Sequence, residues 1–184
     1  MSLQLTIAPL IEHLRLHALR TDGPFRLRSG AVSHWYLDAR QTTYSGAGAR
    51  LVGTAVLQAL LPGVEAVGGM TMGADPMAMA TVIAASAQGR DLRAFSIRKE
   101  AKDHGVGGRL VGPVIAGDRV AVLDDTVTTG GALFDAIDAL AAAGVEIVQA
   151  VALVDRSDGR VARETGRRGI PYVALVSPAD LGVA

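Results

Sequence analysis

Residues 119–132 have the sequence RVAVLDDTVTTGGA, which contains one predicted structural element, the turn after it and the start of the next element. An apolar run ends at two adjacent carboxylates, Asp124 and Asp125, and a stretch of threonine and glycine then leads into an alanine-rich segment. Such a continuous apolar run is typical of a strand that is buried on both faces of a parallel sheet. The alanine-rich segment, residues 132–143, predicts a helix that covers the sheet. The passage therefore indicates an α/β fold.

The same order of strand and helix repeats along most of the chain. We expect strands at residues 64–67, 92–97, 119–123, 145–154 and 172–176, and helices at residues 49–61, 76–87, 132–143 and 161–166. This alternation predicts a central, mostly parallel sheet that is flanked by helices. The sequence has no internal repeat and no long linker, so we expect a single domain over residues 1–184.

Residues 1–40 depart from this repeat and predict a small N-terminal hood within the same domain. Apolar side chains at helical spacing indicate an amphipathic helix over residues 3–19, which ends before the turn formers at residues 21–24. Residues 25–40 alternate polar and apolar side chains, which predicts two short strands joined at Ser29 and Gly30. We expect this segment to be an antiparallel attachment in which Trp35 has a structural role.

The composition limits the classes of function. A chain of 184 residues that is 49% hydrophobic can bury a sizeable core. Eighteen basic and eighteen acidic residues give a net charge of zero, which argues against a nucleic-acid partner. The absence of cysteine excludes disulfides, thiolate metal sites and a cysteine nucleophile. Without an apolar run of membrane length or signal-peptide features, we expect a cytoplasmic protein with no membrane partner.

The segment after the apolar run predicts a site for a phosphorylated sugar. Ligands of open parallel sheets bind outside the carboxyl ends of the strands. Threonine hydroxyls, glycine N–H groups and a helix N-terminus suit a phosphate. Asp124 and Asp125 cannot bind a phosphate themselves, but they suit sugar hydroxyls or a divalent cation shared with a polyphosphate. The alternative is an acidic helix cap with a threonine-rich turn and no ligand.

Three further segments follow predicted strands and should lie at the same edge of the sheet. They are GGMTMGADP (residues 68–76), RKEAKDHGVGG (residues 98–108) and DRSDG (residues 155–159). The second holds Arg98, Lys99, Lys102 and His104, whose positive charges suit a diphosphate leaving group. The alternatives are a solvated surface loop for this segment and an ordinary strand-to-helix turn for the first.

Other phosphate motifs fit less well. The sequence has no GxxxxGK[ST] motif, and Gly68, Gly69 and Gly73 do not have the GxGxxG spacing of a dinucleotide-binding turn. A phosphotransferase with an aspartyl nucleophile would need a DxD pair or acidic residues spread over several strands. His13 and His17 have the spacing of a helical metal pair, but no third ligand accompanies them, so we expect a polar helix face.

The segment VAVLDDTVTTGGA resembles the phosphoribosyl pyrophosphate (PRPP) motif of type I phosphoribosyltransferases. RKEAKDHGVGG is similar to the loop of the orotate phosphoribosyltransferase family, and the likeness extends to FRLRSG, YLDAR, GGMTMGADP and VDRSDG. The resemblance implies a type I phosphoribosyltransferase-like fold. It also implies transfer of the 5-phosphoribosyl group from PRPP to orotate, which gives orotidine 5′-monophosphate and pyrophosphate in pyrimidine biosynthesis.

The resemblance further implies a role for each site residue. Asp124, Asp125, Lys102 and His104 would be catalytic. PRPP would be bound by Arg98, Lys99, Lys102, His104, Asp124, Asp125, Thr126, Val127, Thr128, Thr129, Gly130, Gly131 and Ala132. Orotate would be bound by Thr128, Arg156 and Arg28. Mg²⁺ would be carried by PRPP, near Asp124 and Asp125 but without a direct protein ligand. The protein would be a homodimer in which Arg98, Lys102 and His104 act in the neighbouring subunit's site.

Two positions depart from the family pattern, because Gly73 and Arg28 stand where members often carry lysine. Two alternatives to the orotate enzyme also remain. A purine-type phosphoribosyltransferase would share the fold and differ in the base pocket. A PRPP-binding regulator that lacks the reaction should carry a nucleic-acid-binding module or a basic face.

Overall fold

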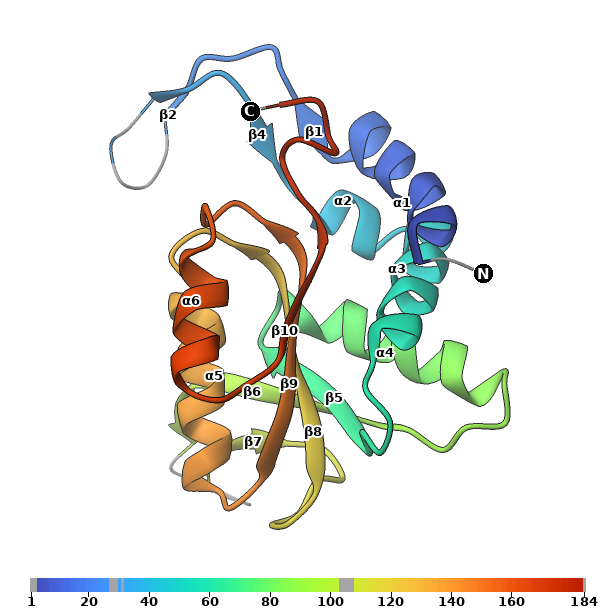
Figure 1. Ribbon diagram of the computed structural model, residues 1–184, viewed down its shortest axis with the longest axis vertical. Helices are drawn as coiled ribbons and strands as arrows, with labels where there is room; N and C mark the ends of the chain where they lie inside the picture. The colour runs from blue at the N-terminus through green and yellow to red at the C-terminus, as the bar shows by residue number, and fades with distance from the viewer. Residues whose placement is uncertain (1–2, 27–29, 31, 103–107, 184) are drawn as a thin grey trace.

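The computed structural model describes residues 3–26, 30, 32–102 and 108–183. A six-stranded sheet forms its centre, in the order β10-β9-β8-β5-β6-β7 (Figure 1). All neighbours pair in parallel except β6 and β7, which are antiparallel. The strands are β5 (Ala66–Met70), β6 (Arg93–Lys102), β7 (Gly108–Val111), β8 (Arg119–Val127), β9 (Glu146–Asp155) and β10 (Tyr172–Val176). The predicted mostly parallel α/β fold is confirmed.

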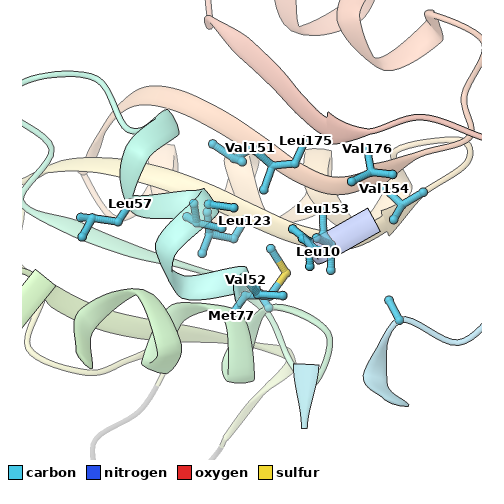
Figure 2. Close-up of a cluster of buried hydrophobic side chains, with 14 of the residues drawn as sticks. Leu10, Val52, Leu57, Met77, Leu123, Val151, Leu153, Val154, Leu175 and Val176 are labelled. Carbon is cyan, nitrogen blue, oxygen red and sulfur yellow. The ribbon is translucent and has the colours of Figure 1, made fainter. Parts of the chain in front are cut away.

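Helices cover both faces of the sheet and enclose two apolar clusters (Figure 1). One face packs against α1 (Leu3–His17), α3 (Gly46–Ala59) and α4 (Ala74–Ser86), and the other against α5 (Gly131–Ala142) and α6 (Arg160–Arg167). Strand residues alternate between the faces, so Leu123 of β8 joins the first cluster while its neighbour Val122 joins the second. Figure 2 shows Leu123 with Leu10, Val52 and Met77 in the first cluster.

The hood consists of two small antiparallel sheets and a short helix. Strand β1 (Leu19–Arg20) pairs with β4 (Tyr36–Leu37), and β2 (Phe25–Arg26) pairs with β3 (Val32–Ser33). Helix α2 (Arg40–Thr43) follows β4 and leads into α3. The predicted antiparallel attachment is confirmed, with four short strands instead of two. Helix α1 anchors the hood to the rest of the molecule, because its Leu10 and Leu14 are buried in the first cluster.

Three strands extend further than the sequence pattern predicts. Strand β5, expected to end at residue 67, continues to Met70. Strand β6 continues to Lys102, so residues 98–102, which we expected to be a loop, are strand. The cause is β7, which lies in the glycine-rich residues 105–117, where we expected no strand, and pairs Leu110 with Ile97. Strand β8 likewise continues to Val127 because it pairs with β9 along its whole length, so Asp124 and Asp125 lie within the strand.

In the part of the chain that the structure describes, no helix is both long and apolar enough to cross a membrane.

Candidate active site

A cleft of about 520 Å³ lies between the hood and the carboxyl ends of the central strands. One wall comes from the hood, through residues 36–40. The others are Met70 at the end of β5 with residues 71–73 after it, Lys99 of β6, and residues 124–126 near the end of β8 with Thr128 and Ala132 beyond them. The cleft therefore lies at the edge of the sheet at which the sequence predicts the site.

Asp124 and Asp125 form the acidic part of this cleft. Asp124 is only 7% exposed, and its Oδ1 accepts the N–H of Asp125 at 3.1 Å. Burial, together with the charge of Asp125, raises the pKa of Asp124 to about 7. Burial also raises the pKa of Asp125, whose Oδ1 accepts the N–H of Thr126 at 2.8 Å. One buried and one half-buried carboxylate with remaining acceptor capacity suit a ligand that offers several hydroxyl donors.

The turn from β8 to α5 has the features of an anion site. Gly130 has a φ of +80°, and a Cβ there would lie 2.6 Å from Phe134 and 2.8 Å from Val161, so the position requires glycine. Helix α5 begins at the next residue, and within the described residues no side chain caps its N-terminus. The N–H groups of its first turn therefore remain available, beside the exposed Thr128 and Thr129.

The turn from β5 to α4 approaches the same carboxylates. A Cβ at Gly73 would lie 2.7 Å from Oδ1 of Asp125, so this glycine lets the backbone lie directly against the carboxylate. The turn is fixed to the sheet by Ser96 of β6, whose hydroxyl donates to Oδ1 of Asp75 at 2.7 Å. Position 73 thus offers backbone and no cation to the cleft.

Arg156 lies next to this cleft, in a cavity of about 540 Å³ that Trp35 also lines. The guanidinium carbon of Arg156 is 3.8 Å from the centre of the Trp35 ring. The backbone N–H of Arg156 donates to the carbonyl of Val127 at 2.8 Å. The neighbouring Asp155 is occupied, because its carboxylate accepts from the Tyr172 hydroxyl at 2.9 Å and from the Ser157 N–H at 2.6 Å. Among the described residues, no carboxylate forms an ion pair with Arg156.

The structure brings six of the fifteen predicted site residues to the lining of the cleft. The residues that line it are Lys99, Asp124, Asp125, Thr126, Thr128 and Ala132. Val127 is buried, and Thr129, Gly130 and Gly131 continue the turn. Arg98 does not line the cleft, and its backbone carbonyl accepts from Nε of Arg109 at 2.7 Å. Lys102 is the last residue of β6, and only its backbone is described. Arg28 and His104 lie outside the described residues.

Three residues near the site were missed by the sequence prediction. Arg40 lines the cleft, although the sequence indicates no role for YLDAR beyond its resemblance to the family. Trp35 was assigned a structural role, but it stacks on Arg156. Arg109 joins β7 to α5 through a two-point contact with Asp135, at 2.9 and 2.6 Å. In the sequence, each of the three lies in or directly beside a segment that resembles the family. That position alone does not identify the residue that each one contacts.

The sheet and the cleft, with its paired carboxylates and threonine-rich turn, define a phosphoribosyltransferase, and residues 66–172 match the family described as phosphoribosyl transferase domain. The chain is 43% identical to the orotate phosphoribosyltransferase of Streptomyces avermitilis over 88% of its own length and 89% of that protein. It belongs to the orotate phosphoribosyltransferase family.

Further similarity agrees with this assignment. The orotate phosphoribosyltransferase of Corynebacterium glutamicum is 39% identical over 96% of this chain and 92% of its own length. A crystal structure of the Mycobacterium tuberculosis H37Rv orotate phosphoribosyltransferase in complex with PRPP has a TM-score of 0.79 at 32% identity, covering 97% of this chain and 99% of that one. Both similarities span the hood as well as the sheet.

Proposed function

We propose that this protein transfers the 5-phosphoribosyl group of PRPP to orotate, which yields orotidine 5′-monophosphate and pyrophosphate in pyrimidine biosynthesis. The observation that carries the proposal is the carboxylate pair of buried Asp124 and half-buried Asp125, placed between a glycine turn and a threonine-rich helix start. Similarity to relatives named as orotate enzymes, over most of the chain, favours orotate over a purine base. We propose residues 1–184 as one domain and the cytoplasm as its location.

In this proposal the two ends of the phosphoribosyl group are bound by different parts of β8 and its turn. Asp124 and Asp125 accept hydrogen bonds from the ribose hydroxyls. The 5′-phosphate lies at the start of α5, where hydroxyls and N–H groups converge. The residues assigned to the phosphate are Thr126, Val127, Thr128, Thr129, Gly130, Gly131 and Ala132. Val127 and the glycines contribute through their backbone only.

The reaction breaks the bond from C1 of the ribose to the diphosphate oxygen, which keeps the electron pair, and forms a bond from C1 to a ring nitrogen of orotate, whose proton passes to solvent. Negative charge develops on the departing diphosphate while the sugar gains oxocarbenium character. Arg98, Lys99, Lys102 and His104 are assigned to stabilise the leaving group, and the buried carboxylate of Asp124 lies on the side of the cationic sugar. These groups act electrostatically, and none of them needs to form a covalent bond.

Magnesium is the cofactor of this proposal, and the donor set of the cleft fits an ion that the substrate carries. Within the described residues there is no group of three or more metal-ligating side chains. Mg²⁺ commonly binds one or two carboxylates together with substrate phosphates and water, and Asp124 and Asp125 are the carboxylates nearest to such a complex. When bound, the ion neutralises charge on the diphosphate.

Orotate is assigned to Arg156 and Thr128, with Arg28 as a third contact. Burial lowers the pKa of Arg156, as expected for a cation that lacks a compensating anion. The carboxylate of orotate would supply that anion in a two-point contact with the guanidinium. Trp35 holds the guanidinium from the other side.

A homodimer completes the proposal, with Arg98, Lys102 and His104 of one subunit acting in the other subunit's site. An exposed apolar stripe on and beside α4, which includes Met72, Met79 and Ile83, supports a surface for self-association. Met72 also lines the cleft, so the stripe and the cleft are continuous. A second subunit on this stripe would lie close to the site.

Orotate consumption by the purified protein with PRPP and Mg²⁺, measured beside hypoxanthine, adenine and uracil, tests the function. Turnover of orotate alone supports the proposal. Turnover of a purine would retain the sugar-phosphate site and overturn the base assignment. Binding of PRPP without turnover of any base would instead indicate a regulator.

Action in trans is tested by mixing two inactive variants, Lys102→Ala and Asp125→Asn. In a mixed dimer one site carries both substitutions and the other carries neither, so activity should return to about a quarter of the wild-type level after subunit exchange. If Lys102 acted within its own subunit, mixing would restore nothing.

A further inference from the structure

Arg40, the first residue of α2, brings a positive charge from the hood into the cleft. Among the described residues that line the cleft, Arg40 and Lys99 are the two cations, and they face three carboxylates, Asp38, Asp124 and Asp125. PRPP, with a monophosphate and a diphosphate, carries more negative charge than orotate, the other proposed substrate. A cation on the hood side of the cleft therefore has an obvious anionic partner.

The guanidinium of Arg40 is held at one end and available at the other. Its Nε donates to Oδ1 of Asp38 at 2.7 Å, and the same oxygen accepts the backbone N–H of Arg40 at 3.3 Å. Gln41 fixes the second oxygen of Asp38 through its Nε2 at 3.2 Å. The described part of the chain offers no hydrogen-bond partner to the two terminal amino groups of Arg40, and 48% of the side chain is exposed. These two groups can donate to a ligand without breaking an existing contact.

Asp125 relates Arg40 to the turn that follows β5. The positive charge of Arg40 acts on Asp125 and opposes the effect of burial on its pKa. Gly73, in the turn after β5, also lies against the Asp125 carboxylate. Arg40 thus lines the same part of the cleft as the turn after β5, whose glycines allow backbone N–H groups to approach the diphosphate closely. The turn at Gly73 supplies backbone N–H groups and no charge, which leaves a cation to come from elsewhere.

We propose that Arg40 binds the diphosphate of PRPP in its own subunit's site, through its terminal amino groups, and that Asp38 positions it there. The planar guanidinium suits phosphate oxygens because two parallel hydrogen bonds can form at once. This proposal rests on the proposed function for the identity of the ligand. It adds a diphosphate contact that remains within one subunit, separate from the residues assigned to act in trans.

The test compares Arg40→Gln with a matched control, Arg119→Gln. Arg119 is equally exposed, at 47%, and is also paired with a carboxylate, Glu146 at 3.7 Å, but it begins β8 at the opposite edge of the sheet. Binding of PRPP, pyrophosphate and ribose 5-phosphate is measured by calorimetry in the presence of Mg²⁺. We expect Arg40→Gln to weaken PRPP and pyrophosphate by roughly 10- to 100-fold, as for loss of hydrogen bonds to a charged group. Ribose 5-phosphate binding should be unchanged, and Arg119→Gln should affect none of the three.

Two further variants keep the test decisive if Arg40→Gln does not fold. Arg40→Lys keeps the charge without the planar fork and should lose part of the pyrophosphate affinity. Asp38→Asn leaves Arg40 in place but removes its support, and should weaken pyrophosphate less than Arg40→Gln does. Equal weakening of all three ligands, or none, would overturn the proposal. Wild-type protein that binds pyrophosphate but does not turn over orotate would refute the function alone, and wild-type protein that binds neither PRPP nor pyrophosphate would refute both.

Discussion

The guanidinium of Arg156 stacks on the ring of Trp35, with 3.8 Å between its central carbon and the ring centre. The contact joins the loop after β9 to the hood, two segments that are far apart in the sequence. Because Asp155 is engaged by Tyr172 and Ser157, the aromatic ring is the partner that holds the arginine in place. A cation held by a ring instead of a carboxylate keeps its charge uncompensated for an anionic ligand.

Removal of the ring should therefore affect orotate more than PRPP. A cation–π contact of this kind contributes about 0.5–2 kcal/mol, so Trp35→Leu should raise KM for orotate by about 2- to 30-fold. Trp35→Phe retains a ring and should lose less. Steady-state kinetics with each substrate varied in turn measure the effect. An equal rise of KM for PRPP in Trp35→Leu would mean that Trp35 supports the hood as a whole.

The raised pKa of Asp124 predicts an unusual dependence of stability on pH. An aspartate is ordinarily half-protonated at 3.8, whereas Asp124 in the folded protein has a pKa of about 7. Between these values the unfolded chain has lost the proton and the folded chain retains it. The contribution of this group to stability is thus fully present below about pH 3.8 and is lost as the pH rises to about 7. The total loss is at most about 4 kcal/mol.

Asp124→Asn removes this loss, since an amide of the same size does not ionise. We expect the variant to gain stability over wild type as the pH rises from 5 to 7, with a constant difference above pH 8. Chemical denaturation across this range, without ligand, measures it. Asp138→Asn, at an exposed position of α5, serves as the control. A difference between Asp124→Asn and wild type that does not vary with pH would contradict the assignment of the raised pKa to Asp124.

The contact between Arg109 and Asp135 should fix the β6–β7 hairpin on α5. Arg109 also donates to the carbonyl of Arg98, so it reaches both strands of the hairpin. The Asp135 side chain is 51% exposed, so solvent screening limits the coupling of the pair to about 0.5–1 kcal/mol. A double-mutant cycle with Arg109→Gln and Asp135→Asn, read by urea denaturation, measures it. Strictly additive effects would show that the two side chains act independently.

The sequence predicts the sheet, the order of its strands and helices along the chain, and the edge of the sheet at which the cleft lies, because these features depend on local patterns. The apolar run before Asp124 is sufficient to place both carboxylates toward the carboxyl end of a buried strand, although that strand continues to Val127. The features that the sequence does not predict depend on contacts that only the folded chain brings together. Strand β7 lies in a glycine-rich segment with little apolar pattern, and it is defined only by its pairing with β6. In the same way, Arg40 gains its role from Asp38 and Asp125 together, and Arg156 from Trp35.

Gly73 offers the sharpest test of the close approach between the β5–α4 turn and Asp125. Its backbone is helical, with φ of −62° and ψ of −44°, so alanine meets no backbone penalty there. A Cβ would, however, lie 2.7 Å from Oδ1 of Asp125 and force the carboxylate to move. We expect Gly73→Ala to raise KM for PRPP by roughly tenfold, which corresponds to about one disturbed hydrogen bond to a charged group.

Gly46→Ala is the matched control for Gly73→Ala. Gly46 begins α3, and a Cβ there would have no atom within 4 Å, so alanine should stabilise the helix slightly and leave KM unchanged. Both variants are compared for KM and for thermal stability. If Gly73→Ala binds PRPP as wild type does, then Asp125 can move without cost and the ribose hydroxyls do not depend on its position. A rise in KM that Gly46→Ala does not share would instead locate the effect at the Asp125 carboxylate, because the two substitutions differ chiefly in what the added methyl group contacts.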